Sequence, residues 1–194
     1  MNTSTPRLAP LAPPYEPDLQ TLLTKMTPPG APDILALFRT LAHHPALAER
    51  MTGWGGFLLS RKATLPLRDR EIVIDRVCAL CGAEYEWGVH VAAFAAAAGL
   101  DNAQTAAIAD PAGDLQVLPE RDRLLVRMAD ELHSTSTVSA ALWAELAAGW
   151  TPPQLVELLM LAGWYRTISY VCNATGVPLE PWAATFGAYP RSTP

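Results

Sequence analysis

Residues 70–90 read REIVIDRVCALCGAEYEWGVH, and this stretch predicts two successive buried helices separated by Gly82. Apolar side chains occupy nearly every side of the first segment, residues 70–81, which is typical of a helix buried all round. After Gly82, residues 84–98 predict a second helix, which Gly99 is placed to end. Both segments therefore belong to the core of the molecule.

The chain on either side of this stretch is also helical in pattern. Apolar residues recur at three- and four-residue spacing, no segment alternates convincingly with a period of two, and no block repeats at a fixed period. We therefore predict an all-α fold of roughly seven to nine helices. The other expected helices cover residues 18–26, 33–41, 45–51, 101–109, 120–132, 139–148 and 154–173, with Asp69 and Asp101 as helix caps and with Gly53, Gly55 and Gly56 loosening the chain around Trp54.

Proline marks the boundary of the expected domain. Eight of the 18 prolines fall within residues 1–32, a density that a helix interior does not tolerate. We predict a Pro-rich N-terminal arm over residues 1–32, either disordered or lying on another subunit, and a single all-α domain over residues 33–194. In the tail beyond residue 177, we expect Trp182 and Phe186 to pack back on the body.

Composition narrows the class of protein. The 194 residues (20.9 kDa) are 50% hydrophobic and 17% charged, enough apolar material for a core, and the net charge of −5 without a basic run argues against a nucleic-acid partner. The longest apolar stretch, residues 89–100, has about half the length of a membrane span. No secretory signal is evident, and an odd count of three cysteines fits a reducing cytoplasm.

Three titratable residues of the 70–90 stretch are candidates for chemistry. Glu86 and His90 lie four residues apart on one helix face, where they form either an acid–base pair or an ordinary surface ion pair. Glu71 begins a helix that is otherwise core, so it either stabilises the helix dipole or is a buried functional acid.

Cys78 and Cys81 form a C-x-x-C near a helix end, where the dipole disfavours a thiolate. We therefore expect two buried thiols that pack as small hydrophobes, without a disulfide. No second ligand pair at zinc-like spacing exists, so we predict neither a metal nor a cofactor.

The 70–90 stretch, followed by VAAFAAAAGL, resembles the core of the carboxymuconolactone decarboxylase and alkylhydroperoxidase D-like family. Many members of this family carry an RE-L/I-V-I-L-R-V run and then a G-x-EYEW-x-x-H motif. The resemblance implies an alkylhydroperoxidase D-like helical bundle. In the peroxidase branch a Glu is followed twelve residues later by a C-x-x-C, with a His four residues after the second Cys. On this chain these positions are Glu71, Ala83, Glu86 and His90, so the acid and the histidine are present and both redox thiols are absent.

The resemblance implies a small-molecule enzyme with Glu71, Glu86 and His90 as catalytic residues and with Tyr85 and Trp87 binding substrate. The leading hypothesis is decarboxylation or proton transfer on a carboxylated or lactone-like substrate. The alternatives are a peroxidase that uses thiols, with Cys78 and Cys81 recruited, and a non-catalytic helical binding scaffold. We expect the three catalytic candidates to share a water-accessible pocket in which at least one carboxylate is partly protonated near neutral pH.

A homo-oligomer is the expected assembly. Family members of this kind form dimers, trimers or hexamers, and large aromatic side chains are enriched at interfaces. The tryptophans that suggest such a surface are Trp54, Trp143, Trp150, Trp164 and Trp182.

Overall fold

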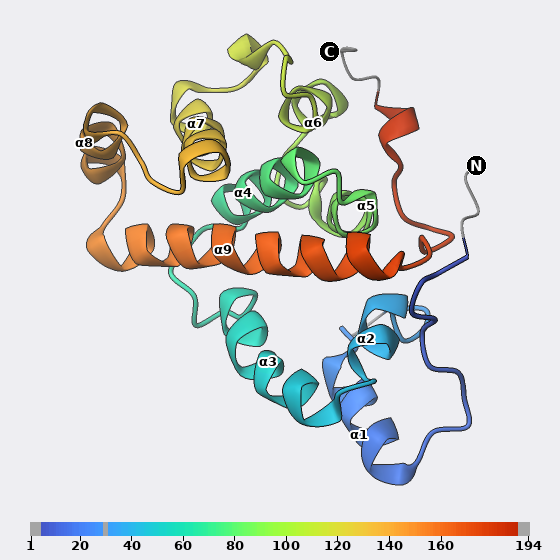
Figure 1. Cartoon of the computed structure of the whole chain (residues 1–194). Coiled ribbons are helices and arrows are strands. Elements are labelled where there is room, and N and C mark those ends of the chain that lie inside the picture. Colours follow the sequence, from blue (N-terminus) through green and yellow to red (C-terminus); the bar gives the residue numbers. More distant parts are fainter. Residues whose placement is uncertain (1–4, 29–30, 190–194) are drawn as a thin grey trace.

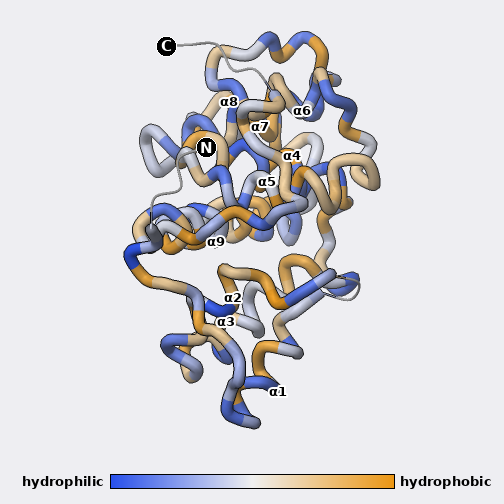
Figure 2. The backbone as a smooth tube through the Cα atoms, turned by 90° about the vertical axis from the view of Figure 1, so that its right-hand side faces the viewer, coloured by the Kyte–Doolittle hydropathy of each residue, from blue (hydrophilic) through white to orange (hydrophobic). Residues whose placement is uncertain are grey.

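The computed structural model describes residues 5–28 and 31–189, and this part of the chain is entirely helical, without a β-strand. Figures 1 and 2 show the long helix α9 crossing the molecule, with α1 to α3 on one side of it and α4 to α8 on the other. The helices are α1 (Pro17–Met26), α2 (Ala36–Leu41), α3 (Pro45–Leu58), α4 (Leu67–Leu80), α5 (Glu84–Phe94), α6 (Asn102–Ala109), α7 (Glu120–Thr135), α8 (Ala140–Gly149) and α9 (Pro152–Thr175), with short 3₁₀ turns at Leu115–Val117 and Phe186–Ala188.

Helix α4 is the centre of the core, as its apolar composition predicts. It packs against α5, α6, α7 and α9, and Ile72, Val73 and Ile74 are completely buried. Because successive residues of a helix point in different directions, three buried neighbours in a row require partners on every side.

One of the three expected helix ends is observed: Asp101 caps α6 in a full capping box with Gln104. Gly99 adopts the left-handed conformation (φ +69°), but α5 already ends at Phe94, so Gly99 closes the turns that follow the helix and not the helix itself. Asp69 does not cap α4, which begins one turn earlier after Pro66. Its buried carboxylate instead accepts hydrogen bonds from Arg121 Nη2 and Trp150 Nε1, both at 2.7 Å.

The expectation that glycines loosen the chain after residue 51 is wrong. Helix α3 continues through Gly53, Gly55 and Gly56 to Leu58. A Cβ on Gly55 would lie 2.6 Å from Cζ2 of Trp164, so the absent side chain lets the Trp164 ring of α9 pack directly on α3.

The described part of the N-terminal arm lies on its own chain. The amides of Arg7 and Leu8 donate to the carbonyl of Thr175 at the end of α9, and Leu11 donates to Arg39 of α2. Helix α1 then packs against α2 and α3 and buries Leu23 completely.

The tail after α9 returns across α5. Ala184 donates to the carbonyl of Gly88 (3.0 Å), and the Phe186 ring packs on Trp87 with centroids 4.7 Å apart. Phe186 thus packs as expected, whereas Trp182 remains 38% exposed because it lies before this contact, at a turn.

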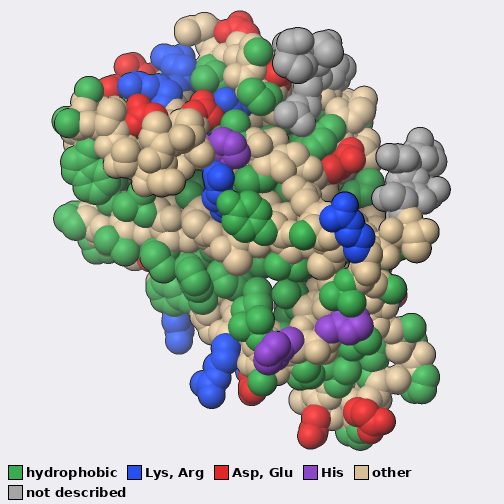
Figure 3. Space-filling view, in the orientation of Figure 1, with side chains coloured by type: hydrophobic (Ala, Val, Ile, Leu, Met, Phe, Trp, Pro, Cys, Tyr) green, Lys and Arg blue, Asp and Glu red, His purple; other side chains and the backbone are tan. Residues whose placement is uncertain are grey.

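Apolar side chains also gather on the surface where α3 meets α9 (Figure 3). Trp54, Phe57 and Met160 are each more than 40% exposed there. The homo-oligomer expected from the sequence stays a prediction, and this is a surface that such an assembly would cover.

Replacing Gly88 with Ala is expected to loosen the tail, because the added Cβ would lie 2.1 Å from the carbonyl oxygen of Ala184. We expect the free energy of unfolding to fall by about 1–3 kcal/mol, the usual cost of overpacking, and proteolysis to cut first near residue 184. Urea denaturation and limited proteolysis measure both effects. Gly163→Ala is the control, since its Cβ meets nothing within 4 Å; an equal loss in both variants would contradict the prediction.

Candidate functional site

Glu71, Glu86 and His90 meet in the wedge between α4, α5 and α9. The Glu71 Oε2 atom lies 2.7 Å from His90 Nδ1, and Glu86 Oε1 lies 3.7 Å from His90 Nε2. Arg70 Nε donates to the other oxygen of Glu71 at 3.1 Å. The break at Gly82 turns α5 back along α4, which brings two residues 19 positions apart into direct contact. Their catalytic role stays a prediction.

Two further residues belong to this cluster and were not singled out from the sequence. The Tyr165 hydroxyl, from α9, lies 3.0 Å from His90 Nε2. Asp75 lies one turn after Glu71 on α4 and is 1% exposed. Within the described part of the chain, neither oxygen of Asp75 has a hydrogen-bond partner. An unpaired buried carboxylate is costly in its charged form, so Asp75 is the strained member of the cluster.

The protonation of His90 follows from its neighbours. Burial by itself lowers the pKa of His90, but the charge and hydrogen bond of Glu71, together with Glu86 and Asp75, outweigh burial and raise it. The positive imidazolium is therefore favoured, with Nδ1–H donating to Glu71. In the neutral ring, Nε2 would accept a hydrogen bond from the hydroxyl of Tyr165.

The carboxyl groups of Asp75 and Glu86 both shift toward their neutral forms. Burial, and then the charge of Glu71, raises the pKa of Asp75 well above its ordinary value, although His90 opposes the shift. Burial also raises the pKa of Glu86, against the opposing charge of His90. The cluster thus combines two carboxyl groups that are shifted toward their neutral forms with one imidazole, an arrangement that general acid–base chemistry uses.

These shifts predict that stability falls as the pH rises. A folded state that binds protons more tightly than the unfolded chain loses stability above the unfolded pKa, which is 3.8 for Asp75 and 4.5 for Glu86. His90 acts with the same sign, because its raised pKa adds stability below 6.5 that is lost as the pH passes the folded value. We expect Asp75→Asn, which is neutral at every pH, to flatten the decline by up to about 1.4 kcal/mol per pH unit.

Urea denaturation between about pH 5 and pH 8 measures this effect, and the exposed Glu49 provides the control substitution Glu49→Gln. We expect the free energy of unfolding of Asp75→Asn to exceed that of the wild type near the upper end of this pH range. Near the lower end, the two values should lie closer together. If the free energy of unfolding varies with pH equally in Asp75→Asn and in the wild type, Asp75 is ionised in the folded protein.

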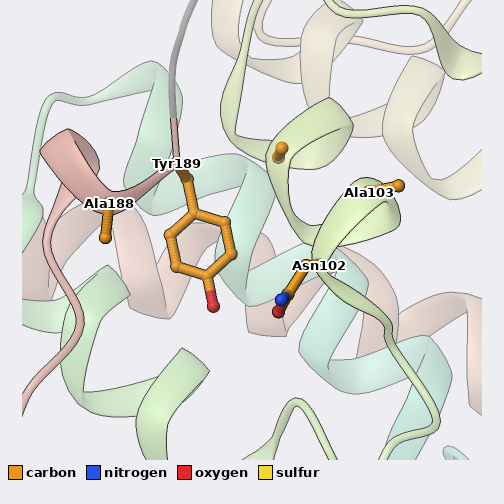
Figure 4. A pocket seen from close by; sticks show the side chains of 5 residues that line it. Asn102, Ala103, Ala188 and Tyr189 are labelled. Carbon is orange, nitrogen blue, oxygen red and sulfur yellow. The ribbon is translucent and has the colours of Figure 1, made fainter.

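The expected water access is wrong for the isolated chain. The side chains of Glu71, His90 and Glu86 are only 1%, 5% and 9% exposed. The two described surface cavities lie elsewhere. The larger, about 520 Å³, lies between the tail and α6, where the Tyr189 ring hangs opposite Asn102 (Figure 4).

Tyr85 contacts the C-terminal tail and α2, and Trp87 contacts the tail. The Tyr85 hydroxyl donates to Glu180 Oε1 (2.7 Å) and accepts from the amide of Leu37 (3.1 Å), which ties the tail to α2. Burial raises the pKa of Tyr85, so its hydroxyl stays protonated. Trp87 is fully buried under Phe186 and Tyr189. Their role in substrate binding stays a prediction.

The three cysteines are free thiols, as expected, although burial differs among them. Cys78 and Cys172 are buried and Cys81 is half-buried, so the prediction of full burial is wrong for Cys81, which lies at the exposed C-terminal end of α4. Burial raises the pKa of all three thiols, and Glu86 raises it further for Cys78 and Cys172.

Thiol titration is therefore expected to distinguish Cys81 from the other two. In native protein a reagent such as Ellman's should modify Cys81 slowly and leave Cys78 and Cys172 intact, whereas all three react after unfolding in urea. Cys81→Ser should then remove the native reaction. Rapid modification of Cys78 in folded protein would mean that the wedge opens readily.

No group of three or more His, Cys, Asp or Glu side chains in the described ranges is placed to hold a metal ion. None of the helices in the described ranges combines the length and the apolar character needed to cross a membrane.

Comparison with known proteins identifies relatives of the chain. Residues 45–121 match the family model described as Carboxymuconolactone decarboxylase family. No curated protein sequence matches the chain significantly.

Among solved structures, an uncharacterized peroxidase-related protein from Silicibacter sp. TM1040 superposes with a TM-score of 0.78 at 16% identity, covering 95% of this chain and 100% of that chain. The alkylhydroperoxidase AhpD core of a peroxidase-related protein from Ralstonia eutropha JMP134 gives 0.75 at 17% identity, covering 90% and 93%. A variant of the debrominase Bmp8 in complex with 2,3,4-tribromopyrrole gives 0.72 at 17% identity, covering 93% and 94%. At these identities the likeness shows the fold, and the predicted all-α, alkylhydroperoxidase D-like bundle is confirmed.

Proposed function

We propose that this chain is a small-molecule enzyme in which the Glu71–His90 pair moves a proton to and from Glu86. Residues 45–121 match the carboxymuconolactone decarboxylase family model, and the fold is AhpD-like. The observation that carries the proposal is the buried 2.7 Å contact between Glu71 Oε2 and His90 Nδ1. This contact fixes the ring, so Nε2 faces Glu86 and Tyr165.

The substrate class follows from the leading hypothesis: a carboxylated lactone or a similar β-keto acid. When its C–C bond to the carboxylate breaks, CO₂ leaves and the electron pair moves into the adjacent carbonyl as an enolate. Protonated Glu86 then donates its proton to the substrate carbon, and His90 restores that proton. The raised pKa of Glu86 suits this role, because burial keeps the acid protonated closer to neutral pH.

The substrate would reach the cluster from the side of Glu86. Its side chain is 9% exposed, whereas that of Glu71 is 1% exposed. Glu71 therefore orients His90 from inside the core, and Glu86 is the group that meets substrate.

The comparisons favour a second candidate, a thiol peroxidase, since two of the similar folds belong to peroxidase-related proteins. Here Cys78, which lies 4.0 Å from the Ser169 hydroxyl, would attack a hydroperoxide. The O–O bond would break, alcohol would leave, and the resulting sulfenic acid would condense with Cys172 or Cys81 to a disulfide and water. The raised pKa of Cys78 argues against this candidate, because the attacking form is the thiolate.

One set of variants separates the two candidates: wild type, His90→Asn and Cys78→Ser. Each is offered carboxylated γ-lactones and β-keto acids in D₂O, with CO₂ release and deuterium incorporation as readouts, and then an organic hydroperoxide with dithiothreitol. Proton transfer predicts that His90→Asn loses activity on the first panel while Cys78→Ser keeps it. Peroxide consumption that Cys78→Ser abolishes would establish the second candidate, and no turnover on either panel would leave a binding scaffold.

A further inference from the structure

A second cavity, of about 160 Å³, opens between α4, α7 and α9, away from the Glu71–His90 cluster. Its apolar walls include Val77, Leu132, Leu159 and Ala162, and its polar lining includes His133 and Arg166. Figure 3 shows a histidine beside a basic side chain on the face above α9. The cavity therefore combines an apolar interior with a cationic edge.

The guanidinium of Arg166 has unused hydrogen-bonding capacity. Its Nε donates to the Tyr170 hydroxyl (2.7 Å), and its Nη1 contacts Nδ1 and the carbonyl oxygen of His133 (3.0 and 3.3 Å). A guanidinium carries five N–H donors, so the two on Nη2 remain for a ligand. In the described part of the chain no carboxylate forms an ion pair with Arg166.

His133 adds an uncharged hydrogen-bond donor to the lining of this cavity. Burial, and then the nearby Arg166, lowers the pKa of His133, so its ring is neutral at physiological pH. Because Nδ1 accepts from Arg166, the ring proton lies on Nε2. The cavity thus has one uncompensated positive charge, on Arg166.

We propose that this cavity binds a small monocarboxylate with an apolar body: the carboxylate pairs with Arg166, and the body lies against Val77, Leu132 and Leu159. The planar guanidinium matches the geometry of a carboxylate, and a single charge matches a monoanion. The volume equals roughly five water molecules, enough for one small ring or a short alkyl chain. The site is separate from the proposed proton-transfer reaction and does not rest on it.

Calorimetric titration with benzoate tests the proposal, with benzamide as the uncharged probe of the same shape. We expect saturable benzoate binding to the full chain and at least about tenfold weaker binding of benzamide, the usual worth of a charge-assisted pair. Arg166→Gln should weaken benzoate binding by a similar factor. Arg127→Gln is the matched control, because Arg127 forms an exposed ion pair with Glu145 on neighbouring helices.

A second variant tests the cavity itself. Gly163 lines the cavity, and a Cβ there meets nothing within 4 Å, so Gly163→Leu should fold normally and block the space. Gly53→Leu, at an equally open helical position on α3, is its control. Equal binding of benzamide, benzoate binding unaffected by both Arg166→Gln and Gly163→Leu, or no saturable binding up to about 10 mM would overturn the proposal.

Discussion

Glu86→Gln is expected to lower the rate of proton transfer by at least about 100-fold, the usual contribution of a general acid or base. The amide has the shape of the acid but cannot give up and recover a proton at neutral pH. Because Glu86 is buried beside His90 and burial raises the pKa of its carboxyl group, the neutral amide should fit without disturbing the fold. Deuterium incorporation into the product of the substrate that the panel identifies measures the rate, and circular dichroism checks the fold.

Glu84→Gln is the matched control on the same helix. Its side-chain oxygen accepts a hydrogen bond from the amide of Phe186 (2.8 Å), and the amide oxygen of Gln can still accept it. The pH profile provides a second readout: the limb that reports Glu86 should disappear in Glu86→Gln and remain in Glu84→Gln. Retention of more than half the wild-type rate by Glu86→Gln would assign the proton to another group, with Asp75 or Tyr165 the nearest.

Helical spacing was sufficient to predict the core of this fold. Side chains four residues apart share a helix face, so Glu86 and His90 had to lie together, and the break at Gly82 made an approach of Glu71 plausible. The structure places all three in contact. Local sequence rules worked here because both helices are consecutive in the chain.

The parts that were missed depend on contacts between distant segments. Tyr165 reaches His90 from 75 residues further along the chain, and no local pattern reports that distance. The stripe Tyr165, Ser169 and Cys172 at four- and three-residue spacing on α9 was the available signal, because a polar pair inside a buried face needs partners. Gly55 was misinterpreted for the same reason: its role depends on a contact with the Trp164 ring, which lies more than 100 residues further along the chain.

Access to the site was the other error. Three titratable side chains in one place suggested a solvated pocket. They are buried because apolar residues of α4 and α5 surround them and α9 packs against both helices. Sequence periodicity identifies which face of a helix is apolar. Whether a polar group within that face reaches solvent depends here on α9, which packs on α4 and α5.

The largest expected effect on stability comes from Arg76, a fully engaged guanidinium on α4 that is 2% exposed. Its Nε and Nη2 donate to the two oxygens of Asp130 on α7 (2.6 and 2.9 Å), and its Nη1 donates to the carbonyls of Ile108 and Asp110 (3.1 and 2.9 Å). One side chain thus joins three helices. Arg76→Met is expected to reduce the free energy of unfolding by about 2–4 kcal/mol, mainly because it removes the buried hydrogen bonds to the carbonyls of Ile108 and Asp110. The lost pair with Asp130 contributes less, because the Asp130 side chain is 36% exposed.

Arg127→Met supplies the comparison, since the Arg127–Glu145 pair is about 45% exposed on both sides and surface pairs contribute about 1 kcal/mol or less. Urea denaturation of the two variants at neutral pH gives the difference directly. Adding Asp130→Leu to Arg76→Met should recover part of the loss, because the carboxylate that Arg76 neutralised is then gone. The hydrogen bonds from Arg76 to the two carbonyls are lost in both variants. Equal stability of Arg76→Met and Arg127→Met would show that the contacts of Arg76 with α6 and α7 contribute no more than an exposed surface pair.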